Sequence, residues 1–160
     1  MNKLLENRKL ISDASFTIMD LINGDRDIVT ACDYDVVING KTIHPEIVIF
    51  RPRGLSIVNT EVLKAEKPPE LVIELGSISD GELLSIKRGV YAELGIEEYW
   101  VIDLNSKVVV QFTLKGGTYG GRNAIYTGDC IEHKNGIMLN VDEMFYKLKE
   151  LANKKSRLSA

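Results

Sequence analysis

The sequence has few of the residues that mark secreted, metal-scaffold or membrane proteins. It contains two cysteines, Cys32 and Cys130, which are far apart and lack the spacing of metal ligands. No apolar run approaches the eighteen or so residues of a membrane span. Charged residues such as Lys3 and Glu6 near the start argue against a secretory signal. We therefore expect a cytoplasmic protein with no membrane segment, in which both thiols are reduced and buried.

An excess of positive charge is also missing. The chain has 20 lysines and arginines against 23 aspartates and glutamates, which gives a net charge of −3. Nucleic-acid-binding domains are usually basic, so any contact with nucleic acid must come from a local patch. The apolar content of 44% and the length of 160 residues suit one globular domain, and we expect residues 1–160 to form it.

The hydrophobic pattern predicts an α/β (α+β) fold, a mixed β-sheet flanked by helices. Helices are expected at residues 3–23, 81–94 and 141–154. Asn39-Gly40 predicts a hairpin between strands at 27–38 and 42–50. Further strands are expected at 70–75, 98–103, 107–114 and 119–126. Residues 51–67 have no clear period and predict a loop with a short strand at 55–58 and a helical turn near Val62.

Charged residues interrupt this pattern at two positions near the middle of the chain. Glu74 ends an apolar, β-branched run that is typical of a strand buried on both faces. The helix expected after it has an apolar stripe of Leu83, Ile86, Val90, Tyr91 and Leu94, and Lys87 falls within that stripe. Burying either charge is costly without a partner. Glu74 is therefore either a site residue or an edge-strand carboxylate facing water, and Lys87 either reaches an anion or extends past the sheet to solvent.

A third charge, Glu46, begins a strand in a similar way. Pro45-Glu46 is followed by an apolar run, as is Pro69-Glu70 ahead of Glu74. If the strands are neighbours, Glu46 and Glu74 converge on one sheet face. Paired carboxylates repel unless a cation binds them, and Mg²⁺ prefers one or two carboxylates with waters and phosphate. Glu46 is otherwise a solvated glutamate at a strand start.

A family resemblance rests on these same residues. The chain has Pro-Glu before an apolar strand, then PELVIELGS, and then KRGVYAELGIEEYWVID at residues 87–103. Over residues 45–114 it resembles the bacterial family described as putative restriction endonucleases, a branch of the PD-(D/E)XK nuclease superfamily. The resemblance implies a restriction-endonuclease-like core. It also implies that Glu46 and Glu74 are catalytic acids that bind metal and that Lys87 is a helix-borne catalytic lysine.

The resemblance further implies a DNA endonuclease that uses Mg²⁺ or Mn²⁺ to hydrolyse phosphodiester bonds. A homodimer would suit the cutting of both strands of a duplex. Basic residues next to the two acid-bearing strands are expected to contact nucleic acid: Arg51, Arg53, Lys64 and Lys67. The family's first acid is usually Asp, and this chain has Glu46. The alternative interpretation is therefore an inactive member that serves as a nucleic-acid-binding or dimerisation module.

Overall fold

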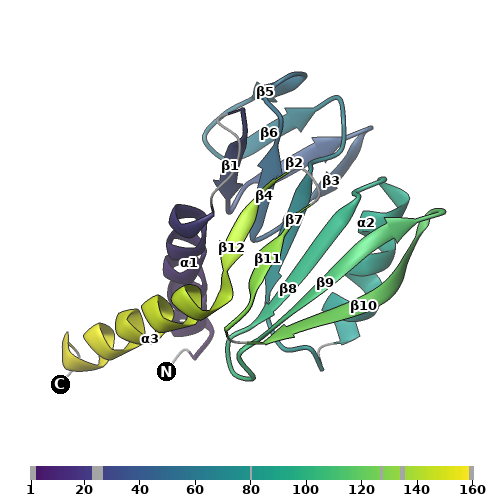
Figure 1. Ribbon diagram of the computed structural model, residues 1–160. Helices are drawn as coiled ribbons and strands as arrows, with labels where there is room; N and C mark the ends of the chain where they lie inside the picture. The colour runs from purple at the N-terminus through teal and green to yellow at the C-terminus, as the bar shows by residue number, and fades with distance from the viewer. Residues whose placement is uncertain (1–2, 23–26, 80, 127, 134–135, 159–160) are drawn as a thin grey trace.

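The computed structural model describes residues 3–22, 27–79, 81–126, 128–133 and 136–158. Its centre is a six-stranded sheet with the order β1-β4-β7-β8-β9-β10 (Figure 1). The strands are β1 (Val29–Cys32), β4 (Ile47–Phe50), β7 (Leu71–Leu75), β8 (Glu98–Asp103), β9 (Val108–Lys115) and β10 (Thr118–Tyr126). Only β7 and β8 run parallel, and the other neighbours are antiparallel. The sheet is therefore mixed, as the sequence predicts.

Two apolar layers cover the two faces of this sheet. On one face, Ile47, Ile73 and Trp100 pack with residues of α1 (Lys3–Leu21), α3 (Val141–Leu158) and a hairpin of β11 (Cys130–Glu132) and β12 (Met138–Asn140). On the other face, Val48 and Val72 pack with residues of α2 (Arg88–Glu93) and of a second sheet. Because both faces are covered, every residue of β4, β7 and β8 is buried.

The second sheet has the order β3-β2-β6-β5 and lies at the upper end of the molecule in Figure 1. Its strands are β2 (Asp35–Ile38), β3 (Lys41–Ile43), β5 (Leu55–Ile57) and β6 (Val62–Ala65). Asn39 and Gly40, with φ of 51° and 75°, turn β2 into β3. Positive φ at both central residues belongs to the type I′ hairpin turn that Asn-Gly favours, so the predicted turn is confirmed.

The long strands expected on either side of that turn are each broken in two. Asp33 has a φ of 61°, which ends β1 and lets β2 leave for the other sheet. His44, Pro45 and Glu46 separate β3 from β4. One stretch of chain thus contributes to both sheets, and the expectation of two uninterrupted strands at 27–38 and 42–50 is wrong.

Residues 51–67 are more regular than expected. The short strand near 55–58 is present as β5, but Val62 begins strand β6 and not a helical turn. β6 pairs with β2 in parallel and with β5 antiparallel, and its Leu63 and Ala65 are buried in the core. Long-range pairing with β2, which local periodicity does not report, gives this segment its structure. The β11–β12 hairpin was likewise not predicted.

The helix expected at 81–94 begins as a π-helix, η1 (Glu82–Lys87), and continues as α2. A π-turn has i→i+5 hydrogen bonds and changes the angle between successive side chains. Tyr91 and Leu94 of the predicted stripe are buried, but Ile86 is 65% exposed. The assignment of Ile86 to the buried face is therefore wrong.

Both cysteines are free, as expected, but they are not buried. Cys32 is half-buried at the end of edge strand β1, and Cys130 is exposed because Ile131 takes the inward position at the start of β11. No helix among the described residues is long and apolar enough to cross a bilayer.

Candidate active site

Glu46 and Glu74 stand side by side on neighbouring antiparallel strands. Ile47, the first residue of β4, is opposite Ile73 of β7, so Glu46 just before β4 and Glu74 on β7 extend the same register. Residues opposite each other in an antiparallel pair point to the same face. That face is the one on which Val48 and Val72 pack, beneath α2 and the second sheet. The predicted convergence of the two strands is therefore present.

Glu74 is a buried carboxylate held by two side chains. It is 1% exposed, on an inner strand, which rules out the edge-strand alternative. The Tyr91 hydroxyl donates to its Oε1 over 2.5 Å, and Lys87 Nζ lies 3.2 Å from its Oε2. Burial raises the pKa of Glu74, and Glu46 adds to the rise, whereas Lys87 and Tyr91 oppose it. Of the two alternatives for Lys87, the structure therefore shows the one in which it reaches an anion.

Lys87 reaches this carboxylate from the junction between η1 and α2. Its side chain is 29% exposed, so the ammonium group touches both Glu74 and solvent. Tyr91 follows one helical turn later and donates to the other oxygen. Burial and the neighbouring Glu74 charge raise the pKa of Tyr91, so its hydroxyl stays protonated and remains a donor. The helix therefore presents two donors to one carboxylate.

Glu46 is half-buried, which excludes a fully solvated side chain. Partial burial raises the pKa of its carboxyl, and Asp33 adds to that rise, while Lys87 and His44 lower it. The positive charge of Lys87 lowers the pKa of both Glu46 and Glu74, so one ammonium group stabilises the ionised form of both carboxyls. Two carboxylates with raised pKa values and one lysine that lowers the pKa of both form a site that is short of positive charge.

Next to Glu46, His44 contacts the carboxylates of Asp33 and Asp35, and we call this group the His44 clamp. Asp33 continues the register between β1 and β4, and its N–H donates to the Glu46 carbonyl over 3.3 Å. His44 Nε2 lies 3.0 Å from Asp33 Oδ1, and its Nδ1 lies 2.7 Å from Asp35 Oδ1. Partial burial disfavours the charged ring, but the two carboxylates outweigh this effect and raise the pKa of His44.

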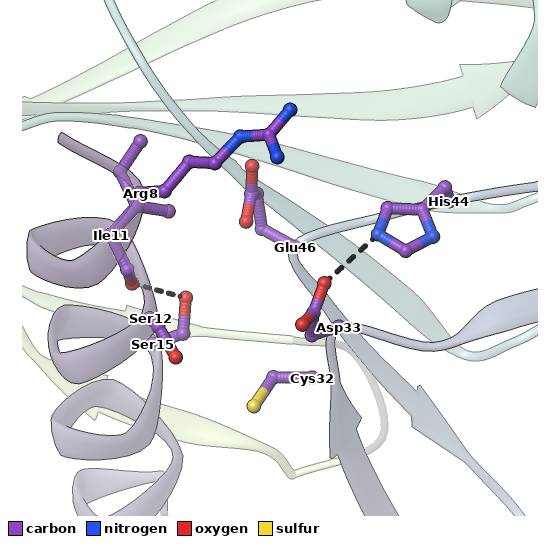
Figure 2. A pocket seen from close by; sticks show the side chains of 8 residues that line it. All are labelled: Arg8, Ile11, Ser12, Ser15, Cys32, Asp33, His44 and Glu46. Atoms are coloured by element: carbon purple, nitrogen blue, oxygen red, sulfur yellow. Dashed lines mark hydrogen bonds and ion pairs between the residues drawn. The ribbon is translucent and has the colours of Figure 1, made fainter. Parts of the chain in front are cut away.

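A cleft of approximately 470 Å³ opens beside Glu46 (Figure 2). One wall is α1, and the other contains residues of the β1 and β4 ends. Its lining residues are Arg8, Ile11, Ser12, Ser15, Cys32, Asp33, His44 and Glu46. Figure 2 shows the Arg8 guanidinium extending from α1 over the Glu46 carboxylate. Glu74 and Lys87 are not among the lining residues, so the cleft reaches the carboxylate pair from the Glu46 side.

The loop after β7 is held in place by Asp103 at the end of β8. Asp103 is 1% exposed, and its Oδ2 accepts from the Ile78 N–H over 3.0 Å. Its Oδ1 accepts from the N–H groups of Asn105 and Ser106. Burial alone would raise the pKa of Asp103, but these backbone donors lower it. Asp103 thus holds the turn after β8, and its bond to Ile78 links that turn to the loop after β7.

The predicted nucleic-acid contacts lie elsewhere. Arg51 follows β4 at the end opposite Glu46, and it lines a second cleft of approximately 280 Å³ together with Arg53 and Lys67. A four-residue strand separates Arg51 from Glu46, or about 16 Å at the rise of a β-strand. Lys64 is exposed on β6 and does not line that cleft. These residues do not border the carboxylate pair, and their contact with nucleic acid stays a prediction.

Sequence reasoning missed the partners that surround the three predicted site residues. Tyr91 is expected on the apolar stripe of its helix, although its position one turn after Lys87 could have linked it to Glu74. The Asp33–His44–Asp35 group has no diagnostic spacing, because it forms only when β1, β2 and the start of β4 meet. Arg8 carries no local signal either, since its position depends on how α1 packs against the sheet.

Comparison with known proteins agrees with this architecture. The family model Uma2, described as putative restriction endonuclease, matches residues 6–141. A solved structure of a putative nuclease belonging to DUF820 from Anabaena variabilis superposes with a TM-score of 0.63. It is 12% identical, with 88% of this chain and 80% of that chain covered, so the likeness concerns the fold. No curated protein matches. The chain belongs to the Uma2 family of putative restriction endonucleases.

Proposed function

We propose that the protein is a metal-dependent DNA endonuclease in which Glu46 and Glu74 hold a divalent cation and Lys87 assists the attacking water. The observation that carries this proposal is the paired register of the two glutamates, with Lys87 against one of them. Membership of a family of putative restriction endonucleases supports DNA as the substrate.

The donor set fits a hard cation. Among the described residues there is no group of three or more His, Cys, Asp or Glu side chains arranged to hold a metal. Mg²⁺ does not need such a cage, because it binds through one or two carboxylates and fills its octahedron with waters and substrate phosphate. Both glutamates have raised pKa values, and a divalent cation would supply the missing positive charge. Mn²⁺ suits the same oxygen ligands.

The chain's own residues have separate tasks in this proposal. Glu46 and Glu74 hold the cation, which when bound polarises the phosphate and lowers the pKa of water. Tyr91 fixes the orientation of Glu74 through its hydrogen bond. Lys87, which lies against Glu74, would orient the water that attacks phosphorus and balance charge on the phosphate. The water oxygen bonds to phosphorus, one ester P–O bond breaks, and the departing oxygen takes up a proton as the water loses one.

The test is cleavage of plasmid and linear duplex DNA by the purified protein with Mg²⁺ or Mn²⁺. Glu46→Gln, Glu74→Gln and Lys87→Gln should each lower the cleavage rate by at least about a hundredfold, as expected for loss of a charged group that stabilises the transition state. Glu61→Gln removes an exposed carboxylate that does not line the cleft and should cut at the wild-type rate. Circular dichroism establishes that each variant is folded.

Calorimetric titration with Mn²⁺ gives a readout that is independent of cleavage. The proposal expects binding by the wild type and by Glu61→Gln, and its loss in Glu46→Gln and Glu74→Gln. Absence of metal binding and of cleavage in folded wild-type protein would overturn the proposal. The inactive binding module predicted as the alternative would then be favoured if the same protein still bound DNA.

A further inference from the structure

The cleft beside Glu46 contains a cation that the catalytic proposal does not use. Arg8 lines this cleft from α1, and its side chain is exposed. Within the described part of the chain, the Arg8 guanidinium makes no hydrogen bond and no ion pair. Figure 2 shows it directed over the Glu46 carboxylate. An arginine that faces a carboxylate without pairing to it leaves space between the two groups.

Three of the four residues on the wall of α1 that faces this space are polar. Arg8, Ile11, Ser12 and Ser15 all line the cleft, and steps of three and four residues place them on one face of the helix. The Ser15 hydroxyl is already used, because it donates to the Ile11 carbonyl over 2.8 Å. Ser12 is half-buried and lies one turn after Arg8 on the same wall of the cleft.

The opposite wall is anionic. Asp33 and Glu46 line it, and His44 offsets part of their charge. A free anion would be repelled by these carboxylates, but an anion bound through a cation on Glu46 would not be. Such a ligand would present its outer oxygens toward α1, where a planar guanidinium and a hydroxyl are suited to receive them. The cleft volume of approximately 470 Å³ lies within the range of ligand sites, about 300–1,000 Å³.

We propose that Arg8, together with Ser12, binds a backbone phosphate of the DNA strand held at Glu46, so that α1 forms the substrate wall opposite the carboxylates. This inference rests on the proposed function for the identity of the ligand. It assigns a role to the N-terminal helix, which lies outside the 45–114 segment that carries the catalytic residues. Arg8 binds the phosphate, and Glu46 and Glu74 act on the other side of it.

The chain offers a matched control for Arg8. Lys9 is the next residue on α1, is exposed, and does not line the cleft. Arg8→Gln and Lys9→Gln each remove one positive charge from the same helical turn, so they have equal effects on net charge. Arg8→Lys keeps the charge but loses the planar fork. Because both side chains are exposed, all three variants should fold, which circular dichroism checks.

The experiment measures the affinity for a short DNA duplex by fluorescence anisotropy across a range of NaCl concentrations, with Ca²⁺ in place of Mg²⁺. Arg8→Gln should weaken binding roughly tenfold at low salt and reduce the slope of log K against log salt by about 0.9. Lys9→Gln should change both quantities much less, and Arg8→Lys should recover most of the slope. Equal effects of Arg8→Gln and Lys9→Gln would overturn the inference.

Titration with inorganic phosphate separates this inference from the proposed function. If the wild type neither binds nor cuts DNA, the endonuclease proposal fails, and the phosphate titration then decides on Arg8. Binding of inorganic phosphate in the presence of Mg²⁺ that is lost in Arg8→Gln but kept in Lys9→Gln would support the phosphate site alone. Absence of that binding, together with absence of DNA binding, would overturn both.

Discussion

Tyr91 donates a hydrogen bond to the buried carboxylate of Glu74, and Lys87 contacts the other oxygen of the same group. The two donors come from one helix, four residues apart, while the acceptor comes from the middle of the main sheet. Neither oxygen of Glu74 lacks a partner, which is why a carboxylate that is 1% exposed can be held in the core.

The first prediction concerns this bond. Tyr91→Phe keeps the ring that packs edge-on against Tyr99 at 5.1 Å but removes the donor to Glu74. Loss of one partner from a buried acceptor should lower the free energy of unfolding by about 1–3 kcal/mol. Urea denaturation measures the change. Tyr146→Phe is the control, because that side chain is 63% exposed and should shift stability by less than about 0.5 kcal/mol.

The same variant should weaken metal binding without changing the ligands. A Glu74 carboxylate freed on one side can rotate, so Mn²⁺ affinity measured by calorimetry should fall about tenfold or more, as it does when partners of metal ligands are removed. Wild-type affinity in Tyr91→Phe would show that the bond serves stability only.

The second prediction concerns Asp103 and pH. The pKa of Asp103 is lowered from its ordinary value of 3.8, because three backbone N–H groups donate to the ionised form. Its contribution to stability is therefore present above pH 3.8 and is lost as the pH falls through the lowered value. Asp103→Asn should be less stable than wild type at neutral pH, by about 1–3 kcal/mol.

Denaturation of Asp103→Asn and wild type at a series of pH values tests whether the stability contributed by Asp103 falls in acid, as predicted. The difference in unfolding free energy should shrink progressively below pH 3.8 and stay constant between pH 5 and 8. A difference that does not change in acid would mean that the ionised carboxylate contributes nothing that the amide lacks.

The third prediction concerns the His44 clamp. Its folded pKa is raised above 6.5 by Asp35 and Asp33, so its contribution to stability is complete below pH 6.5 and disappears as the pH rises through the raised value. His44→Gln should therefore be less stable than wild type at pH 5.5 and should approach it at higher pH. His44 is largely exposed, so the effect should not exceed about 1 kcal/mol.

The salt dependence of the stability difference between His44→Gln and wild type tests whether that difference is electrostatic. Ion pairs between exposed groups are screened at high ionic strength, so 1 M NaCl should reduce the pH-dependent difference. Equal stability losses at pH 5.5 and 8.5, or losses that salt does not alter, would contradict an electrostatic clamp.

The three catalytic candidates could be found in the sequence because each violates a hydrophobic pattern. Glu74 interrupts a β-branched run, Lys87 interrupts a helical stripe, and Glu46 repeats the Pro-Glu entry into a buried strand. Such violations are local and need no knowledge of the fold. One of the two alternatives for Lys87, contact with an anion, followed from them, as did the convergence of Glu46 and Glu74 once β4 and β7 are neighbours. Their catalytic roles stay predictions.

The features that escaped prediction depend on contacts between distant segments. The break at Asp33 requires a positive φ. A polar residue within a β-rich run does not by itself predict that backbone conformation. β6 exists because it pairs with β2, and the π-helical turn before Lys87 exposes Ile86 against its apolar character. Arg8 reaches the cleft only through the packing of α1. Local periodicity contains none of this information.

The pairing of β4 with β7 has a consequence for how errors in folding would appear. Side chains alternate between faces along a strand, so a slip of β4 by one residue would turn Glu46 away from Glu74 and bring Ile47 to face Lys87 instead. The hydrophobic layers on both sides of the sheet oppose that slip, since it would exchange their contents. The two glutamates therefore come together only when β4 and β7 are paired in the correct register. Binding of a cation to the pair would then also indicate that register.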